Sequence, residues 1–378
     1  MTSSPEFVPV SSQHAVKLCA NLMNWTPSWN QIRCSPIQRG KSNQIFICQL
    51  GESSPSSSTL FCQQPKVPTK VIVRFYGSEH TGKGNRYKSL CEENELELLR
   101  ILHDRGMGPK VHATFDGGRI EEFVESTPML HRDLITAPMV KILGRKVAQF
   151  NSLEHWKLVP DSNVFDAFSN LRAQRDEQLI EIEKKIELIS TGSGKAKWLA
   201  IKEFTESDVI DSLVNTCRQY FHTKIFAHLD LNYTNFLLIK STDENNNHVE
   251  GLQDIMLIDL ENCMLAYRAI ELGKFFGELS FEEDIYHSLP CELYEELIQA
   301  FCGSYLDEWR KSGKYCDPVF EDFDYVQKEI KLGILFSTVF HIIWNQIHPD
   351  FPQDSLLNNT ANRINLFKKL ANRWPILE

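Results

Sequence analysis

Two short stretches, FAHLDLNYTNFLLI at 226–239 and IMLIDLE at 255–261, constrain the fold of this chain more than any other feature. The first carries the pattern H-x-D-x-x-x-x-N, in which Asp230 and Asn235 lead into an apolar strand, and the second ends an apolar strand on Asp259. Because apolar strands anchor these loops to a rigid sheet, the polar side chains can face one common phosphate. In phosphoryl-transfer enzymes such a loop supplies a carboxylate near the acceptor hydroxyl and an amide for Mg²⁺, while the acid after the next strand holds the same metal ions.

Length and charge bound the classes of protein that fit this pattern. A chain of 378 residues with 42% hydrophobic residues can bury a large core, and it is long enough for two lobes. The formal net charge of -10 argues against a general nucleic-acid binder, whose phosphate contacts need clustered Lys and Arg. We therefore expect no nucleic-acid partner, and any anionic ligand has to be met by local basic groups.

Cysteine usage and hydropathy predict a cytoplasmic protein without a membrane span. The 10 Cys include no C-x-x-C pair, so reduced thiols are a simpler interpretation than a zinc site or a redox motif. The N-terminal MTSSPEF lacks the basic and apolar segments of a signal peptide. The most apolar run, Leu332–Trp344, is shorter than the roughly 20 residues that a bilayer span needs, so we expect a buried helix there.

The first third of the chain predicts a small sheet. Strands at 31–39 and 44–50 flank the polar turn Gly40–Asn43, over which a nucleotide phosphate could lie, although an ordinary hairpin loop gives the same pattern. The strand at 71–77 places Arg74 among apolar residues, where a charge is costly unless it meets an anion or a carboxylate. Arg74 is therefore a candidate phosphate ligand, and the alternative is an edge-strand Arg that faces water.

A helix at 92–103 and a hairpin of strands at 109–115 and 119–124 complete this part, and from Pro128 the pattern is mainly helical. This order matches the small lobe of kinase-like folds, in which the last strand leads to a hinge that reads adenine. We therefore predict an α+β, two-lobed protein-kinase-like fold with ATP between the lobes. Its predicted parts are an N-terminal helical extension (1–30), a small nucleotide-binding lobe (31–125) and a large helical catalytic and acceptor-binding lobe (126–378).

From about Trp29 to Trp344 the sequence resembles the choline/ethanolamine kinase family. The likeness is carried by motifs in the family's order: RGKSN at 39–43, VIVRFYG at 71–77, MGPK at 107–110, RIEEF at 119–123, the H-x-D-x-x-x-x-N loop, IDLE at 258–261, and the Tyr, Arg, Gly, Phe and Glu of 267–278. The resemblance implies phosphorylation of ethanolamine or choline with ATP and Mg²⁺, the first step of phosphatidylethanolamine or phosphatidylcholine synthesis. It also implies that a homodimer is possible.

The resemblance assigns roles to single residues. Asp230 would be the catalytic residue that accepts or orients the hydroxyl proton, and His228 would orient the loop rather than act as a base. For the metal, Asn235 and Asp259 would hold Mg²⁺, and Glu261 would support them. For the nucleotide, the phosphates would be bound by Arg74, Gly40, Ser42 and Asn43. Glu95 would pair with Arg74, and Glu122 and Phe123 would belong to the hinge strand.

The acceptor site differs from the family pattern in one informative place. The family's W-x-x-W pair is His341 to Trp344 here, so one ring face is missing for a quaternary ammonium group, unless both residues are merely core positions of an apolar helix. A primary ammonium group brings three N–H donors and prefers carboxylates, which Glu278, Glu283 and Asp284 could supply. We therefore expect a preference for ethanolamine over choline.

Two alternatives stay open. A related small-molecule kinase of the aminoglycoside or homoserine type would share the H-x-D-x-x-x-x-N loop, although the extended motif run favours the choline/ethanolamine family. The other alternative is a catalytically silent nucleotide-binding scaffold, because Glu271 stands where the family usually has Asp, and Lys274 where it usually has Asn. The presence of Asp230, Asn235 and Asp259 argues against a silent scaffold.

Overall fold

The computed structural model describes residues 10–25, 30–37, 43–51, 68–76, 90–188, 192–242, 248–279, 291–314 and 317–374. The predicted site residues Gly40, Ser42 and Glu283 lie outside these ranges. The chain divides into two compact units, Met1–Thr127 and Pro128–Glu378. The first is built on a sheet and the second mainly on helices, as the α+β prediction expected.

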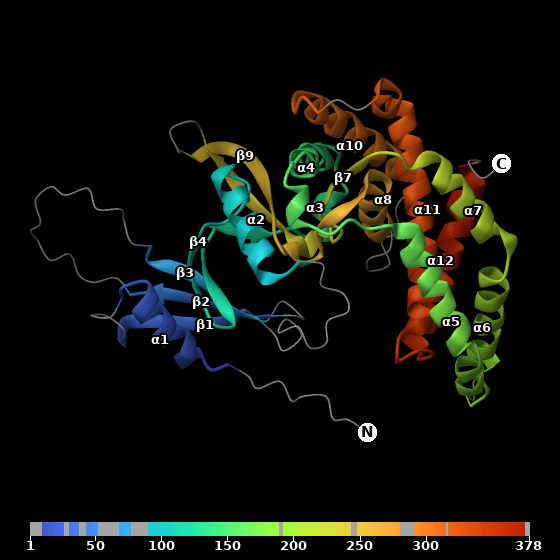
Figure 1. The fold of residues 1–378 in the computed structure, drawn as a ribbon, viewed down its shortest axis with the longest axis horizontal. Coiled ribbons are helices and arrows are strands. Elements are labelled where there is room, and N and C mark those ends of the chain that lie inside the picture. The colour runs from blue at the N-terminus through green and yellow to red at the C-terminus, as the bar shows by residue number, and fades with distance from the viewer. Residues whose placement is uncertain are drawn as a thin grey trace, which may run out of the picture. The chain divides into compact units, whose positions relative to one another are not determined.

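The first unit is an antiparallel sheet whose strands lie in the order β1-β2-β3-β5-β4, with α1 packed on β1 and β2 (Figure 1). Its described elements are α1 (Ser12–Leu22), β1 (Ile32–Ile37), β2 (Asn43–Leu50), β3 (Lys70–Tyr76), α2 (Glu92–Asp104), β4 (Val111–Phe115) and β5 (Gly118–Glu122), and β6 (Ser126–Pro128) lies at the boundary of the two units.

Strand β3 is rich in β-branched and aromatic residues, and burial alternates along it. Val71, Val73 and Phe75 are buried on one face, where Ala15 and Cys19 of α1 join the same core. Arg74 therefore points to the other face of the sheet. Because β3 pairs with β2 on one side and β5 on the other, the alternative of an edge-strand Arg that faces water is wrong.

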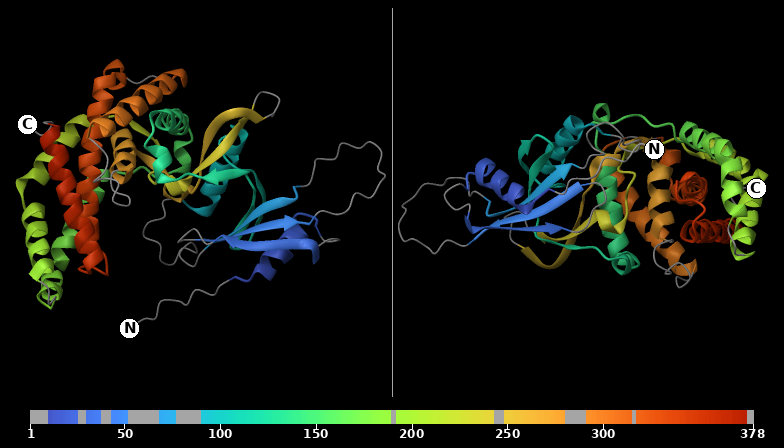
Figure 2. Two further views of the ribbon diagram at one scale, coloured as in Figure 1. Left: turned by 180° about the vertical axis from the view of Figure 1, so that it is seen from behind. Right: turned by 90° about the horizontal axis from the view of Figure 1, so that it is seen from below.

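The second unit is mostly helical, and α5, α6, α11 and α12 gather at one end of it (Figures 1 and 2). Its described helices are α3 (His131–Leu134), α4 (Ala137–Asn151), η2 (Trp156–Leu158), α5 (Val164–Glu187), α6 (Gly192–Thr205), α7 (Asp208–Tyr220), η3 (Tyr233–Asn235), η4 (Leu260–Asn262), α8 (Arg268–Leu279), α10 (Cys291–Lys311), η5 (Pro318–Glu321), α11 (Phe323–Ile347) and α12 (Asp354–Arg373). The strands pair antiparallel as β7 (Lys224–Ala227) with β10 (Met264–Tyr267), and β8 (Phe236–Thr242) with β9 (His248–Leu257).

Helices α8 and α11 cross so closely that both need glycine at the crossing. A Cβ on Gly273 would lie 2.1 Å from the Gly333 carbonyl carbon, and one on Gly333 would lie 2.0 Å from Ala269 O. Beside the crossing, Arg268 donates from Nε and Nη2 to Glu329 Oε2 at 2.8 and 2.6 Å, and both side chains are fully buried. Because loss of either partner would leave a buried charge uncompensated, this pair fixes how α8 is seated on α11.

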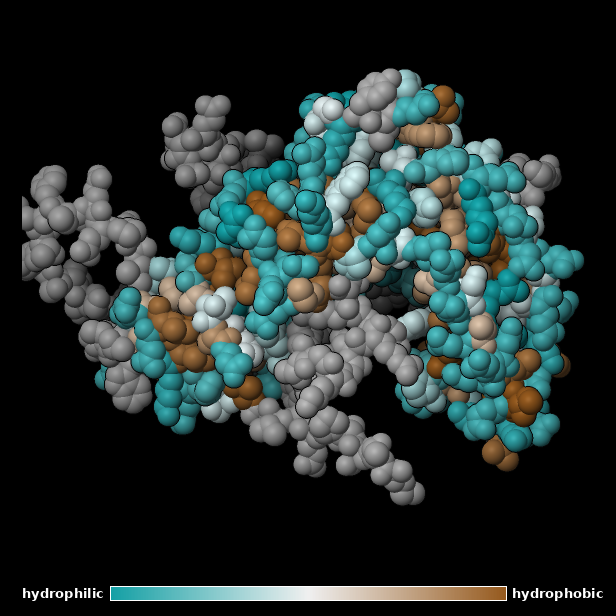
Figure 3. Space-filling model, in the orientation of Figure 1, coloured by the Kyte–Doolittle hydropathy of each residue, from teal (hydrophilic) through white to brown (hydrophobic). Residues whose placement is uncertain are grey.

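Helix α11 contains the apolar run that predicted a buried helix. By length and composition alone this helix could cross a bilayer, but 72% of its most apolar window is buried inside the protein. It packs against α5, α7, α8, α10 and α12, so its neighbours account for its apolar character. Figure 3 shows the visible outer face of α5, α6 and α7 as mainly hydrophilic, with scattered apolar side chains.

We predict that Gly273→Ala lowers the free energy of unfolding by about 3 kcal/mol or more, because the new methyl group would overlap backbone atoms of α11, which cannot rotate away. Gly277→Ala, one turn further along α8, is the matched control. A Cβ there would meet Ser337 Oγ at 3.8 Å, so the change should be neutral or stabilise by up to about 1 kcal/mol through helix propensity. Urea denaturation of both variants checks the prediction, and equal stabilities would contradict it.

Candidate active site

The loop between β7 and β8 brings Asp230 and Asn235 into direct contact. Asn235 Nδ2 donates to Asp230 Oδ2 at 2.8 Å and to Asp230 O at 2.9 Å. Asn235 is buried, whereas 30% of the Asp230 side chain is exposed. Because the Asn235 amide spends its N–H groups on Asp230, its carbonyl oxygen is the atom left for a cation. The structure therefore pairs a partly exposed carboxylate with an oriented amide oxygen.

His228 joins the two motif loops. Its Nε2–H donates to Ile258 O at 2.9 Å, and its Nδ1 accepts the Asp230 N–H at 3.2 Å. The Ile258 N–H in turn donates to Asn235 O at 3.0 Å. Both ring nitrogens are used by the backbone, which fixes a neutral tautomer in a fully buried ring. His228 thus has the contacts of an orienting residue and not those of a general base.

Asp259 follows β9 in a left-handed conformation, with φ 69° and ψ 70°, and leads into η4, where Glu261 lies. Asp tolerates this region better than most residues, but the conformation still costs about 1–2 kcal/mol. Strain of this kind at an acidic residue is common where a side chain is aimed at a ligand. The acid lies next to Ile258, whose peptide contacts both His228 and Asn235.

The donor set fits Mg²⁺ held jointly with a phosphate. Asn235 and Asp259 offer one amide oxygen and one carboxylate, and Mg²⁺ is commonly bound by one or two carboxylates together with phosphate oxygens and water. Within the described ranges, no group of three or more His, Cys, Asp or Glu could hold a metal ion unaided.

Helix α8 holds Leu229, the residue before Asp230, on both sides. Leu229 has φ 57°, which is unusual for a branched side chain. Glu271 Oε2 accepts the Leu229 N–H at 2.7 Å, and Glu271 Oε1 accepts the His228 N–H at 2.9 Å. Lys274 Nζ donates to Leu229 O at 2.5 Å and lies 3.4 Å from Asp230 Oδ1. The two departures from the family pattern, Glu271 and Lys274, are therefore contacts to the loop that carries Asp230.

Glu271 is fully buried, and its surroundings act in opposite directions on its acidity. Burial raises the pKa of Glu271, while the N–H donors of His228, Leu229 and Asn151 oppose that rise. Asn151 in turn donates to Phe226 O at 2.9 Å and accepts from Tyr305 Oη at 3.1 Å. Sequence reasoning missed Asn151, because nothing in the α4 sequence marks its contact with β7.

A second cluster lies further along α8, where Glu278 meets α11 and α12. His341 Nε2 lies 3.3 Å from Glu278 Oε1, and Arg363 Nη2 lies 3.4 Å from the same oxygen. The His341 Nδ1–H donates to Ser337 O at 2.8 Å, so in the neutral ring Nε2 presents a lone pair to Glu278. Arg363 was not predicted, since no spacing in the sequence connects α12 to α8.

Protonation at this cluster follows from burial and from Arg363. Burial, followed by the charges of Arg363 and Lys274, lowers the pKa of His341 to about 4, against the opposing charge of Glu278. Burial alone would raise the pKa of Glu278, but His341, Arg363 and Lys274 together lower it. At neutral pH the cluster therefore holds an ionised Glu278 beside an uncharged imidazole.

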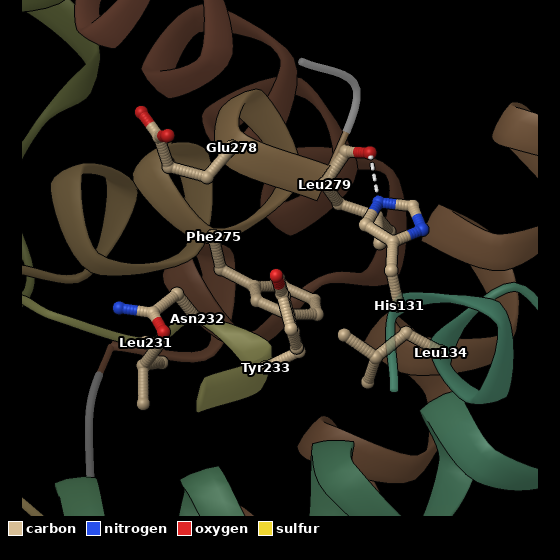
Figure 4. A pocket seen from close by; sticks show the side chains of 8 residues that line it. All are labelled: His131, Leu134, Leu231, Asn232, Tyr233, Phe275, Glu278 and Leu279. Carbon is tan, nitrogen blue, oxygen red and sulfur yellow. Dashed lines mark hydrogen bonds between the residues drawn. The ribbon is translucent and has the colours of Figure 1, made fainter. Parts of the chain in front are cut away.

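A small hollow is lined by Glu278 and by residues of the loop that carries Asp230. Asn232 and Glu278 lie on one side of it, opposite His131 and Leu134 (Figure 4).

Trp344 is half-buried on α11 and stacks on Phe340, with ring centroids 6.5 Å apart and planes at 15°. Phe340 was missed by the sequence analysis, although its spacing of four residues from Trp344 on a helix was available as a signal.

The first unit places the predicted Arg74 in a buried cluster of charges. Arg74 and Arg119 are direct cross-strand partners on β3 and β5. Arg74 Nε lies 3.5 Å from Glu121 Oε1, whereas Glu95 Oε1 pairs with Arg119 Nη2 at 2.9 Å. Glu95 was predicted to pair with Arg74, but it pairs with Arg119 instead. The register of β3 and β5 places Arg119 beside Arg74, and Glu95 of α2 contacts Arg119. Burial opposes the charge of Arg119, yet Glu121 and Glu95 raise its pKa.

The other predicted nucleotide ligands are placed as follows. Asn43 begins β2 opposite Tyr76 of β3. The Glu122 N–H donates to Lys110 O at 2.8 Å, so this backbone donor is used in the sheet rather than left for adenine. Lys70 Nζ lies 3.6 Å from the centroid of the Phe123 ring.

Comparison with known proteins identifies the family of this chain. A sequence model described as choline/ethanolamine kinase matches residues 34–352. Choline kinase A2 of Caenorhabditis elegans is 25% identical over 301 residues, which cover 74% of this chain and 65% of that protein. For the choline/ethanolamine kinase of Homo sapiens the identity is 24% over 259 residues, with 67% and 56% covered. The chain thus spans less than two thirds of the length of these relatives.

Solved structures confirm the kinase-like fold. Choline kinase from Cryptosporidium parvum superposes with a TM-score of 0.65 at 18% identity, covering 97% of this chain and 98% of that one. Plasmodium vivax ethanolamine kinase gives 0.58 at 15% identity, covering 97% and 93%. An aminoglycoside phosphotransferase from Alicyclobacillus acidocaldarius gives 0.53 at 12% identity, covering 99% and 96%. Identities this low show a shared fold alone.

We predict that His341 makes the free energy of unfolding fall as pH drops from about 6.5 to about 4. The folded protein lowers the pKa of His341, so its contribution is fully present above the unfolded pKa and is lost towards the folded one. Urea denaturation across this range should show a loss in wild type larger by roughly 1–3 kcal/mol than in His341→Gln. His348→Gln, at the exposed end of α11, is the control. Parallel pH profiles for wild type and His341→Gln would contradict the prediction.

Proposed function

The chain belongs to the choline/ethanolamine kinase family, and on that premise we propose that it transfers the γ-phosphoryl group of ATP to the hydroxyl of ethanolamine, in preference to choline. The arrangement of Asp230 and Asn235 beside Asp259 supports the phosphoryl transfer. Of the alternatives, a silent scaffold would have no use for an amide and a carboxylate held in this way. The family match favours an amino-alcohol over an aminoglycoside or homoserine acceptor.

The proposed reaction assigns each loop residue a step. The acceptor hydroxyl oxygen attacks the γ-phosphorus, the bond to the β-phosphate oxygen breaks, and ADP leaves. Asp230 receives the hydroxyl proton, since its side chain is partly exposed and its Oδ2 is held by Asn235. Asn235 and Asp259 would hold Mg²⁺ with Glu261 in support, and the bound ion would neutralise charge on the phosphates.

In the first unit, we assign ATP binding to the sheet. Arg74, with Ser42, Asn43 and the backbone at Gly40, would contact the phosphates. Glu95 on α2 pairs with Arg119, and Glu121 on β5 lies beside Arg74. Glu122, at the end of β5, accepts the Lys110 N–H and would lie on the strand that leads towards adenine. Phe123 would follow as part of the strand beside adenine.

One observation carries the preference for ethanolamine. His341 Nε2 and Glu278 Oε1 are two hydrogen-bond acceptors 3.3 Å apart, and the lowered pKa of His341 leaves no proton of its own between them at neutral pH. A primary ammonium group can donate N–H groups to both atoms, whereas a trimethylammonium group has no donor. Trp344 and Phe340 stack on each other, and a ring face would attract either cation, so these rings do not favour ethanolamine.

Asp230→Asn should lower kcat about 10²–10⁴-fold and leave ATP binding nearly unchanged, because the amide keeps the size of the side chain but cannot take a proton. Steady-state kinetics and a direct ATP-binding titration check both parts. Asp166→Asn, at the start of α5, is a matched control that should behave as wild type. An unaltered kcat for Asp230→Asn would remove Asp230 from the catalytic step.

For the acceptor, we expect a higher kcat/KM with ethanolamine than with choline. His341→Trp should shift that ratio towards choline by about tenfold, because it replaces an N–H acceptor with a ring face worth roughly 0.5–2 kcal/mol to a quaternary ammonium. Both substrates are measured on both proteins. A wild type that prefers choline, or a variant with the same ratio as wild type, would show that the pair of acceptors does not select the substrate.

A further inference from the structure

Lys274 is a basic residue that contacts the loop carrying Asp230, and the proposed mechanism assigns it no role. It lies on α8, three residues after Glu271 and four before Glu278, so all three side chains share one face of the helix. The Lys274 ammonium reaches Leu229 O and approaches Asp230 Oδ1. Of its side chain 28% is exposed, which leaves the ammonium accessible to a ligand.

The Lys274 ammonium can offset repulsion between Asp230 and a bound phosphate. Any acceptor hydroxyl that Asp230 serves must lie beside the γ-phosphoryl group, so a carboxylate and a phosphate are brought close together. Asp259 and Glu261, at the start of η4, and Glu278, on the same helix as Lys274, share the sign of the phosphate. A cation 3.4 Å from Asp230 Oδ1 offsets part of this repulsion at the point where charge accumulates.

One N–H group of the Lys274 ammonium has no acceptor among the described residues. A lysine ammonium has three N–H groups. Among the described residues, two acceptors meet it, Leu229 O and Asp230 Oδ1. The third N–H is therefore available to an oxygen atom that arrives with the substrate. Because the ammonium already lies against the carboxylate that takes the proton, that oxygen belongs to the group being transferred.

We propose that Lys274 is a catalytic residue whose ammonium binds an oxygen of the phosphoryl group during its transfer. This inference rests on the proposed phosphoryl transfer but not on the identity of the acceptor. The bonds made and broken stay those given above: the acceptor oxygen bonds to phosphorus, the bond to ADP breaks, and the hydroxyl proton goes to Asp230. Lys274 keeps its own proton throughout and stabilises the charge on the phosphoryl oxygens.

A purely structural part for Lys274 can be separated from this one. If Lys274 only held Leu229 O, an uncharged N–H donor that reaches this carbonyl would serve, since the carbonyl needs one hydrogen bond and no charge. Lys274→Gln supplies an uncharged N–H donor on a side chain one bond shorter, and Lys274→Arg keeps the charge. Lys274→Met, which keeps the aliphatic stem without a donor, is a second uncharged variant should Lys274→Gln fail to fold.

The experiment compares these variants in the full-length protein. We expect Lys274→Gln to lower kcat about 10–10³-fold with little change in the Kd of ATP, and Lys274→Arg to retain most of the rate. Binding of ADP with aluminium fluoride, which imitates the transferring phosphoryl group, should weaken by a similar factor in Lys274→Gln. Lys328→Gln, a partly buried lysine of α11 that donates to Tyr220 Oη, is the control and should match wild type.

Two results would overturn the proposal. One is a Lys274→Gln enzyme with kcat within about twofold of wild type, and the other is a loss of kcat with unaltered affinity for ADP and aluminium fluoride. Should the wild type phosphorylate neither ethanolamine nor choline, the proposed acceptor is wrong. The Lys274 test then uses the rate of ATP hydrolysis by water and the same binding measurement, which need no acceptor.

Discussion

The close crossing of α8 and α11 is the contact on which the geometry of the site depends. Gly273 and Gly333 let the two backbones touch, and the buried pair of Arg268 and Glu329 fixes α8 at its first turn. Once α8 is seated, its polar face is determined. On one face of α8, Glu271 and Lys274 contact the backbone of the loop at Leu229, and Glu278 contacts His341 of α11. A packing constraint thus sets the positions of chemical groups at two ends of the site.

Preorganisation of the loop follows from the same helix. Leu229 and Asp259 both adopt left-handed conformations that cost about 1–2 kcal/mol each, so the loops would relax if nothing held them. Glu271 and Lys274 hold the N–H and C=O of Leu229, and the Ile258 peptide ties the second loop to the first. The strain is therefore offset by tertiary hydrogen bonds, and the polar side chains keep their directions before any substrate arrives.

Much of this could be predicted from sequence because local patterns determine it. The strand that runs into the H-x-D-x-x-x-x-N loop, the buried helix over Leu332–Trp344 and the small sheet all follow from periodicity within single segments. Pairing between distant segments could not be predicted. Glu95 was expected to meet Arg74, but register places Arg119 beside Arg74, and Glu95 pairs with Arg119. The contact of Arg363 with Glu278 joins α12 to α8, and no spacing in the chain encodes it.

In the proposed function, net charge alone does not distinguish ethanolamine from choline, because both alcohols carry one positive charge. Arg363 shares the same Glu278 oxygen, which reduces the net negative charge that either cation meets. What differs is the number of N–H donors, three in one head group and none in the other. The neutral His341 Nε2 responds to that difference, because a buried acceptor left without a donor is penalised, whereas Glu278 Oε1 already accepts from Arg363 Nη2. In the proposed function, burial of His341 keeps its Nε2 unprotonated, and this acceptor would then be the group that distinguishes the two alcohols.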